Sequence, residues 1–195
     1  MVSIRTWRCK FKSIKVTPGI FPMPVLMIGT YNEDGSVDVM NAAWGMAQSM
    51  KHLKLCLTES HKTVKNMKRT GYCTVSLATK DYVAESDYLG MVSGNNVSDK
   101  FEKSGLHSIK SEKVEAPIIE EYPICMECKV LGFEDDGTLV EIVNVLAEDK
   151  YLNEDGTLKL DEMGIIAYDP YGHGYYEVGN KVGQAFSEGK KLMSN

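Results

Sequence analysis

Residues 25–41 read VLMIGTYNEDGSVDVMN, and this stretch indicates the class of fold to expect. Two runs rich in apolar residues, 25–31 and 36–41, flank the tetrapeptide NEDG, which is a strong turn signal. The pattern predicts a β-hairpin. Two longer runs, 125–133 and 139–152, flank EDDGT and predict a second hairpin of the same kind. Two such hairpins favour an antiparallel sheet.

Further elements are short: extended runs cover 52–58, 72–78, 164–170 and 174–179, and helical patterns cover 63–69, 80–92 and 181–193. Strands that alternate with long helices are missing, and no G-x-G-x-x-G follows the first strand, which argues against a doubly wound fold. We therefore expect a mainly β protein, a small antiparallel barrel, closed or split, with Greek-key-like strand order and short helices. No repeat or linker divides residues 1–195, so one domain is expected.

The composition is that of an ordinary globular protein and limits the partners. The net charge is -5 and the pI is near 5.4, which argues against a nucleic-acid partner. Residues 1–20 carry scattered charges where a secretory signal has an apolar core, and no apolar run approaches the ~20 residues that span a bilayer. The five cysteines, an odd number, indicate reduced thiols. These features predict a cytoplasmic protein without a membrane partner.

Cysteine and histidine spacing predicts no metal site. Cys125 and Cys128 form a C-x-x-C, but the run around them alternates like a strand, so their sulfur atoms are expected on opposite faces in a structural role. No second cysteine pair completes a zinc site. The four histidines are widely spread and match no metal-binding pattern: His52, His61, His107 and His173.

The stretch 57–67, LTESHKTVKNM, carries hydroxyls and cations between a predicted strand and a predicted helix. One explanation is that Ser60 or Thr63 caps the helix, which is common for these residue types. The other is an anion, because free N–H groups and the helix dipole favour negative charge at a helix start. The stretch alone leaves both readings open.

Two more stretches carry unusual patterns. In DVMNAAWGMAQS (38–49), small residues around Trp44 would let a flat ring approach the backbone, although a strand end that packs Trp44 into the core is the better explanation of this stretch alone. In SGNNVSDKF (93–101), Asp99 suits a helix cap and places Lys100 in the first turn. A cation there lies at the wrong end of the helix dipole unless a negative group is close.

These stretches resemble a known family. FPMPVLMIGT, VMNAAW, TESHKTVKNM, SGNNVSDKF and APIIEEYPICMEC occur in this order, and together they are similar to the flavin reductase-like FMN-binding split barrels, with the flavoredoxin group nearest. The resemblance covers about residues 22–179. It implies a split β-barrel, a homodimer and one FMN in each subunit near the dimer interface.

The resemblance also implies cofactor-binding residues. The segment 38–44 matches the flavin-ring contacts, 58–63 matches the phosphate segment, and Lys100 matches the lysine of the family's DKF motif. A C-terminal aromatic is expected near the flavin; Tyr168, Tyr171, Tyr175 and Tyr176 are candidates, of which Tyr171 is taken. The implied set is Asp38, Met40, Asn41, Ala42, Trp44, Thr58, Ser60, His61, Lys62, Thr63, Lys100 and Tyr171. Asp38 stands where the flavoredoxin group tends to have Asn, and His61 and Lys62 stand where Arg is frequent.

The implied function is that of an FMN-binding oxidoreductase. Electrons would come from NAD(P)H or a redox partner and pass through the flavin to a flavin, iron or protein acceptor. No catalytic side chain is expected, because the flavin N5 carries the reaction. The alternative is an FMN-binding electron-transfer or flavin-binding protein without enzymatic turnover.

Overall fold

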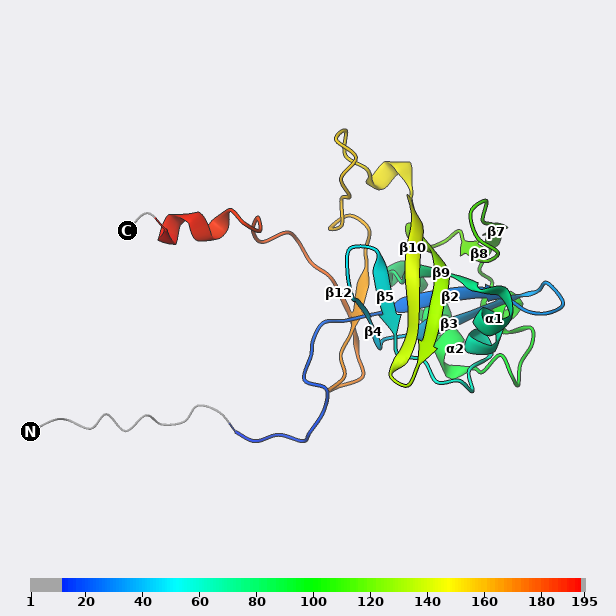
Figure 1. Cartoon of the computed structure of the whole chain (residues 1–195). Coiled ribbons are helices and arrows are strands. Elements are labelled where there is room, and N and C mark those ends of the chain that lie inside the picture. The colour runs from blue at the N-terminus through cyan, green and yellow to red at the C-terminus, as the bar shows by residue number, and fades with distance from the viewer. Residues whose placement is uncertain (1–11, 194–195) are drawn as a thin grey trace, which may run out of the picture.

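The computed structural model describes residues 12–193, and its largest element is an antiparallel sheet of seven strands (Figure 1). The sheet curls into a half-barrel, which confirms the predicted mainly β split-barrel class. Along the sheet, the order is β3 (Val37–Ala42), β2 (Leu26–Tyr31), β6 (Tyr72–Leu77), β9 (Ile124–Glu134), β10 (Gly137–Ala147), β5 (His52–Leu55) and β4 (Gly45–Ala47).

Both predicted hairpins are present. Strands β2 and β3 pair from Leu26↔Ala42 to Tyr31↔Val37, and β9 and β10 pair over their whole length with two bulges. In the first turn, the Asn32 N–H donates to the Ser36 carbonyl oxygen at 2.8 Å, and Gly35 has a φ of 83°, which favours glycine. Local turn chemistry therefore fixes the register of the first pair.

Smaller elements cover the half-barrel. Strands β1 (Met23–Pro24), β11 (Ile166–Tyr168) and β12 (Tyr175–Glu177) form a second sheet, and β7 (Ser108–Lys110) pairs with β8 (Pro117–Ile119). The helices are α1 (Lys62–Thr70), α2 (Val83–Met91) and α3 (Lys100–Ser104), with 3-10 turns η1 (Lys80–Tyr82), η2 (Asp149–Tyr151) and η3 (Glu188–Leu192). Helices α1, α2 and α3 all contact β3.

Two expected helices differ in the structure. The pattern at 80–92 splits into η1 and α2, and the pattern at 181–193 forms only η3. Val182 and Phe186 are fully exposed, so the segment at 181–193 buries no apolar face. Because short helices gain most of their stability from packing such a face, the predicted terminal helix does not form in full.

Two apolar cores lie on the two faces of the sheet. Ile28, Leu55 and Met67 belong to the core that α1 covers, which we call the α1 core. On the other face, Met27 and Leu89 belong to a core that α2 and α3 cover. Alternate residues of β2 thus point into different cores, as strand geometry requires. The arrangement brings the start of α1 and the end of α2 to the same strand, β3.

The cysteines of the C-x-x-C are buried free thiols. Cys128 lies in the α1 core opposite Cys73, whereas Cys125 lines a cavity with Ile119 and Tyr122 on the other face. Burial raises the pKa of the Cys125 thiol to about 11, so this thiol stays protonated at neutral pH. The placement fits the expected structural role.

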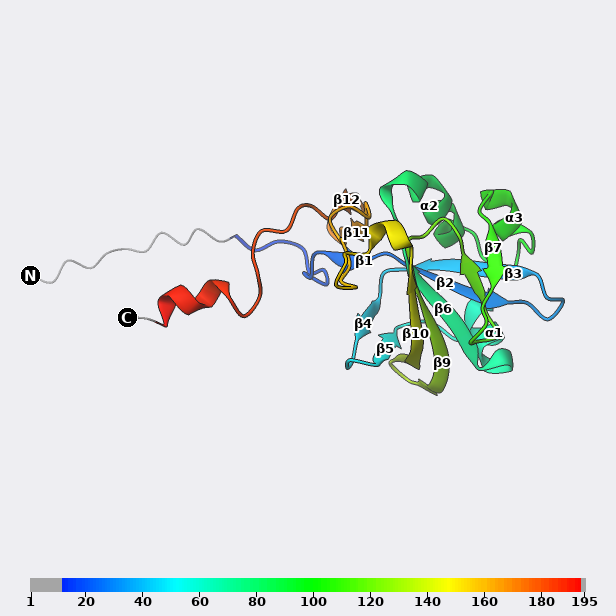
Figure 2. The same cartoon turned by 90° about the horizontal axis from the view of Figure 1, so that it is seen from above.

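The two ends of the described chain extend from the barrel. Residues 12–21 and 179–193 leave it at the end where β1, β11 and β12 lie (Figures 1 and 2). Within residues 12–193, no helix has both the length and the apolar character that crossing a bilayer requires. The sequence predicts no secretory signal in residues 1–20. Of these, residues 1–11 lie outside the described residues.

Candidate functional site

Two adjoining cavities lie between β3, the start of α1 and the end of α2. The larger, of about 410 Å³, we call the wide cavity; it runs from Met40–Trp44 to Tyr168 and Tyr175. The smaller, of about 150 Å³, we call the helix-start cavity; it includes the first residues of α1 and the segment 89–94. Both are lined by Met40, His61, Gly90 and Met91, so they form one continuous depression.

Aromatic side chains form one wall of the wide cavity. Trp44 is half exposed, and its ring centroid lies 6.2 Å from that of Tyr168, which lies 6.1 Å from Tyr175. Ala42 and Ala43 line the same cavity and leave space beside the backbone. The interpretation of Trp44 as a core residue is therefore wrong, since its ring faces a cavity wide enough for a flat heterocycle.

Polar contacts hold the walls of the wide cavity together. The Asn41 side-chain amide donates to the Ser86 carbonyl oxygen at 3.0 Å, which ties β3 to α2. The Tyr175 hydroxyl donates to Asp87 Oδ1 at 2.8 Å. Burial, and then the bond to Asp87, raises the pKa of Tyr175 to about 12. Tyr175 is thus a neutral phenol at physiological pH and presents an uncharged ring to the cavity.

No side chain within residues 12–193 caps the start of α1. His61 occupies the cap position with extended backbone angles, the Thr63 hydroxyl donates to Asp38 Oδ2 at 2.7 Å, and Ser60 Oγ contacts Thr58 Oγ1 at 3.2 Å. The helix-cap explanation of this stretch is therefore wrong. The first N–H groups of a helix have no intrahelical acceptor, so they remain available to a ligand in the helix-start cavity.

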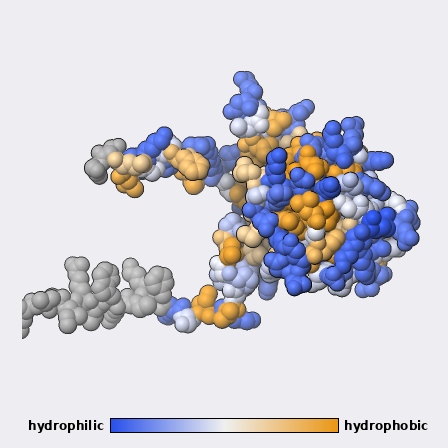
Figure 3. Space-filling model, in the orientation of Figure 1, coloured by the Kyte–Doolittle hydropathy of each residue, from blue (hydrophilic) through white to orange (hydrophobic). Residues whose placement is uncertain are grey.

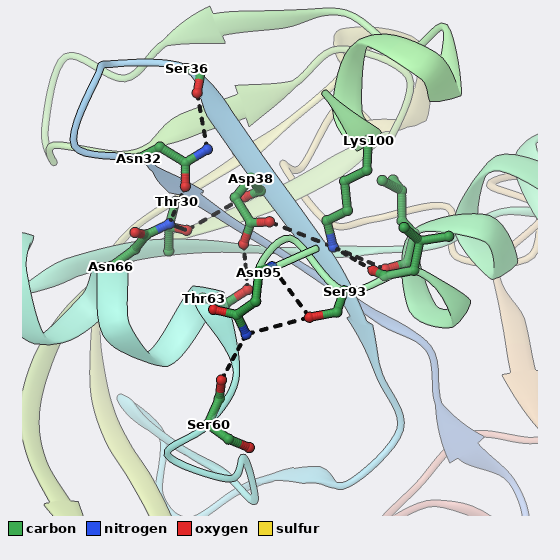
Figure 4. A network of polar contacts seen from close by, with 12 residues as sticks. Thr30, Asn32, Ser36, Asp38, Ser60, Thr63, Asn66, Ser93, Asn95 and Lys100 are labelled. Carbon is green, nitrogen blue, oxygen red and sulfur yellow. Dashed lines mark hydrogen bonds and ion pairs between the residues drawn. The ribbon is translucent and has the colours of Figure 1, made fainter. Parts of the chain in front are cut away.

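The loop that follows α2 lines the helix-start cavity and lies beside the start of α1 (Figure 4). The Asn95 side-chain amide donates to the Ser60 carbonyl oxygen at 2.9 Å, and Lys65 Nζ donates to Asn95 Oδ1 at 2.7 Å. Gly94 in this loop lies close to Asp38 and Lys62: a Cβ at this position would lie 2.3 Å from Asp38 Oδ1 and 3.2 Å from Lys62 Cβ. Only glycine fits here, because the backbone passes directly over Asp38.

Asp38 and Lys100 form a buried ion pair, with Asp38 Oδ1 and Lys100 Nζ 3.5 Å apart. Lys100 Nζ also donates to the carbonyl oxygens of Leu89 (3.2 Å) and Val92 (3.1 Å). Burial lowers the pKa of the Lys100 ammonium, and Asp38 opposes this effect. Asp38 is the negative group that a lysine in the first turn of α3 requires. The expected cap by Asp99 is not formed, because Asp99 pairs with Lys103 at 2.9 Å.

His61 links the two cavities. Its Nε2 lies 3.2 Å from Thr58 Oγ1, while its Nδ1 is buried and has no hydrogen-bond partner in the described part of the chain. A buried polar atom without a partner is costly, so it points to a group that the protein receives from a ligand. His61 lines both cavities, so its ring lies beside any molecule that spans them.

The structure brings most of the predicted residues to one place. The wide cavity is lined by Met40, Asn41, Ala42, Trp44 and His61, and the helix-start cavity by Met40, His61, Lys62, Thr63 and Lys100. Asp38 lies beneath the helix-start cavity as part of the buried pair. Thr58 and Ser60 are exposed and line neither cavity.

Tyr171, the tyrosine taken in the predicted set, lies outside both cavities. It lies half exposed between β11 and β12, its N–H donates to Asp169 Oδ1 at 2.7 Å, and it lines neither cavity. Tyr168 and Tyr175 line the wide cavity instead, because they pair across the β11–β12 ladder and so point to the same side.

Sequence reasoning missed the contributions of α2 and of the segment before α1. Cys56, Leu57, Asp87, Gly90 and Met91 line the wide cavity. A Cβ on Gly90 would lie 3.0 Å from Asn41 Cβ, so glycine allows α2 to approach β3 closely. The helical pattern of 83–91 carries no signal for this, since nothing in the segment itself indicates which face meets β3.

Known proteins support the same interpretation of the fold. Two solved structures are similar over almost the whole chain. A flavoredoxin of Desulfovibrio vulgaris (Miyazaki F) is 29% identical, with a TM-score of 0.88, covering 92% of this chain and 99% of the other. A flavoredoxin from Methanosarcina acetivorans is 26% identical, with a TM-score of 0.81, covering 94% and 100%.

Sequence comparison adds a relative and a family. The uncharacterized protein YdfE of Bacillus subtilis (strain 168) is 22% identical, over 91% of this chain and 94% of its own length. Residues 19–160 match the family model described as "Flavin reductase like domain". The match spans most of the barrel and both cavities apart from Tyr168 and Tyr175, and it confirms the resemblance found in the sequence. The chain therefore belongs to the flavin reductase like domain family.

Proposed function

We propose that the protein is an FMN-dependent oxidoreductase in which the wide cavity holds the isoalloxazine ring and the helix-start cavity holds the phosphate. The observation that carries the proposal is the continuity of the two cavities: an aromatic-walled space adjoins an uncapped helix start. FMN combines a flat ring with a terminal phosphate, so one molecule matches both. Membership of the flavin reductase like domain family supports FMN as the cofactor.

The donors at the phosphate end are mainly backbone groups. The N–H groups in the first turn of α1 point along the helix axis and favour an anion together with the helix dipole. Ser93 lines the same cavity, and its Oγ accepts from the Asn95 N–H at 3.3 Å, which leaves the hydroxyl hydrogen available to a ligand. Lys62, in the first turn, supplies the nearby positive charge.

The residues of the wide cavity shape the surroundings of the ring. FMN, when bound, supplies hydride or electron transfer at N5, which no protein side chain provides. Trp44 and Tyr168 cover apolar surface and exclude water, and the neutral Tyr175 adds no charge. His61 lines both cavities and adds a polar ring between the two ends of the molecule.

Anaerobic reduction tests the proposed activity. Protein loaded with FMN should show the flavin absorption band in the blue, and NADH or NADPH should bleach it within seconds to minutes. Stopped-flow absorbance measures the rate with each nicotinamide. A protein that takes up no FMN refutes the proposal. A bound flavin that dithionite reduces but neither nicotinamide does would instead favour a protein electron donor, as the similarity to two flavoredoxins suggests.

We also propose that the chain forms one domain and assembles as a homodimer. Exposed apolar side chains gather on β9 and β10, among them Leu131, Val143 and Val145 (Figure 3), and the extended arm at 179–193 exposes Val182 and Phe186 completely. Such surfaces are typical of interfaces between subunits. Light scattering should give twice the chain mass of 21.7 kDa; a mass of one chain at micromolar concentration would exclude the dimer.

A further inference from the structure

Two opposite charges are buried directly beneath the helix-start cavity, in a site where a bound phosphate would bring more negative charge. The exposed fractions of Asp38 and Lys100 are 1% and 3%. Asp38 belongs to β3 and Lys100 to α3, and the pair also holds Thr63 of α1 and two carbonyl groups at the end of α2 (Figure 4). Four elements that surround the cavity therefore meet at one ion pair.

The polar hydrogens of this cluster are already engaged. A lysine ammonium has three N–H groups. Three acceptors surround Lys100 Nζ: Asp38 Oδ1, the Leu89 carbonyl oxygen and the Val92 carbonyl oxygen. The single hydroxyl hydrogen of Thr63 goes to Asp38 Oδ2. Neither Lys100 nor Thr63 can donate from its side chain to a phosphate unless it gives up one of these bonds.

Charge leads to the same conclusion. Lys100 is paired with Asp38, so the two contribute little net positive charge to the cavity above them. The carboxylate itself would repel a phosphate if it were a contact. The pair is therefore poorly suited to attracting a phosphate and well suited to holding the surrounding backbone in place.

We propose that Asp38 and Lys100 are positioning residues, which hold the start of α1, the end of α2 and the Gly94 loop in the arrangement that binds the phosphate. The inference rests on the proposed function and deepens it: phosphate recognition belongs to backbone N–H groups, with Ser93 and Lys62, and not to the lysine of the DKF motif. Because each charge compensates the other, removing one leaves a buried charge unpaired, while removing both does not.

A double-mutant cycle tests the inference with FMN and riboflavin as probes. Asp38→Asn and Lys100→Met should each weaken FMN binding about tenfold or more, and the double variant should bind FMN more tightly than either single variant. Riboflavin lacks the phosphate, so the ratio of FMN affinity to riboflavin affinity should fall in both single variants. Fluorescence titration of the full chain measures each affinity.

Several results would overturn the inference. A double variant that binds FMN no better than Lys100→Met would make Lys100 a direct phosphate ligand. Single variants with wild-type FMN affinity would show that the pair does not shape the cavity. Equal losses for FMN and riboflavin would indicate general destabilisation and no specific positioning of the phosphate site.

The exposed pair Asp99–Lys103 on the same helix gives a matched control. Asp99→Asn and Lys103→Met should leave both affinities unchanged, because exposed pairs contribute little. If the wild-type protein takes up no FMN, the proposed function fails. The role of Asp38 and Lys100 is then tested by the unfolding temperatures of their variants without ligand. The double variant should then unfold at a higher temperature than either single variant, and the contrary order would refute the positioning role of the pair.

Discussion

Replacing Gly94 by alanine should weaken FMN binding about a hundredfold. An added Cβ would lie 2.3 Å from Asp38 Oδ1, and Asp38 cannot move aside because Lys100 and Thr63 hold it. The loop over the helix-start cavity must therefore shift. The shift separates the phosphate from the Ser93 hydroxyl and from the start of α1. Loss of two hydrogen bonds to a charged group, at roughly 1.5 kcal/mol each, corresponds to about this factor.

Riboflavin separates the phosphate from the ring in this experiment. Its affinity should change much less in Gly94→Ala, because the wide cavity lies farther along β3. The control is Gly132→Ala, since a Cβ at Gly132 meets nothing within 4 Å. Fluorescence titration of both variants with both ligands gives the four affinities. Wild-type FMN affinity in Gly94→Ala would place the phosphate somewhere other than the helix-start cavity.

Replacing Met67 by alanine should lower the free energy of unfolding by about 2–5 kcal/mol, the usual range for truncation of a large buried side chain. Met67 is fully buried on the inner face of α1 and belongs to the α1 core with Ile28 and Leu55. The protein can close the resulting cavity only if α1 moves toward the sheet. That movement would also displace the helix start on which the phosphate site depends.

Met50→Ala is the matched control, because Met50 is 97% exposed and its truncation should change stability by less than about 0.5 kcal/mol. Urea unfolding followed by circular dichroism measures both variants. One cooperative transition is expected if the chain is a single domain. Equal stabilities of the two variants would mean that α1 does not depend on the core beneath it.

Much of the fold could be predicted because its signals are local. The turn at 32–35 contains Gly35 at positive φ, and the apolar runs on each side pair as β2 and β3. Helix α1 lies within one residue of its predicted range, 63–69, and ends at Gly71, whose φ of 78° is typical of a helix C-cap. The predicted helix at 181–193 failed although its local pattern was present, because its apolar side chains pack against no core.

The sequence predicted which chain segments form the candidate site, but it did not predict the hydrogen bonds within it. The motifs around Met40–Trp44 and His61–Thr63 indicated the segments that meet, and the structure brings them to adjoining cavities. The choice among the tyrosines depended on the pairing of β11 with β12. The wall formed by Asp87, Gly90 and Met91 depended on how α2 packs against β3.

The sequence by itself determined the hairpins, the short helix α1 and the family to which the chain belongs, because turn geometry, residue period and short motifs act between neighbours in the chain. Only the tertiary structure decided that the Thr63 hydroxyl and the Lys100 ammonium are engaged by Asp38. These partners lie far apart in the sequence, and a side chain is free or committed only once folding has brought its acceptor within hydrogen-bonding distance.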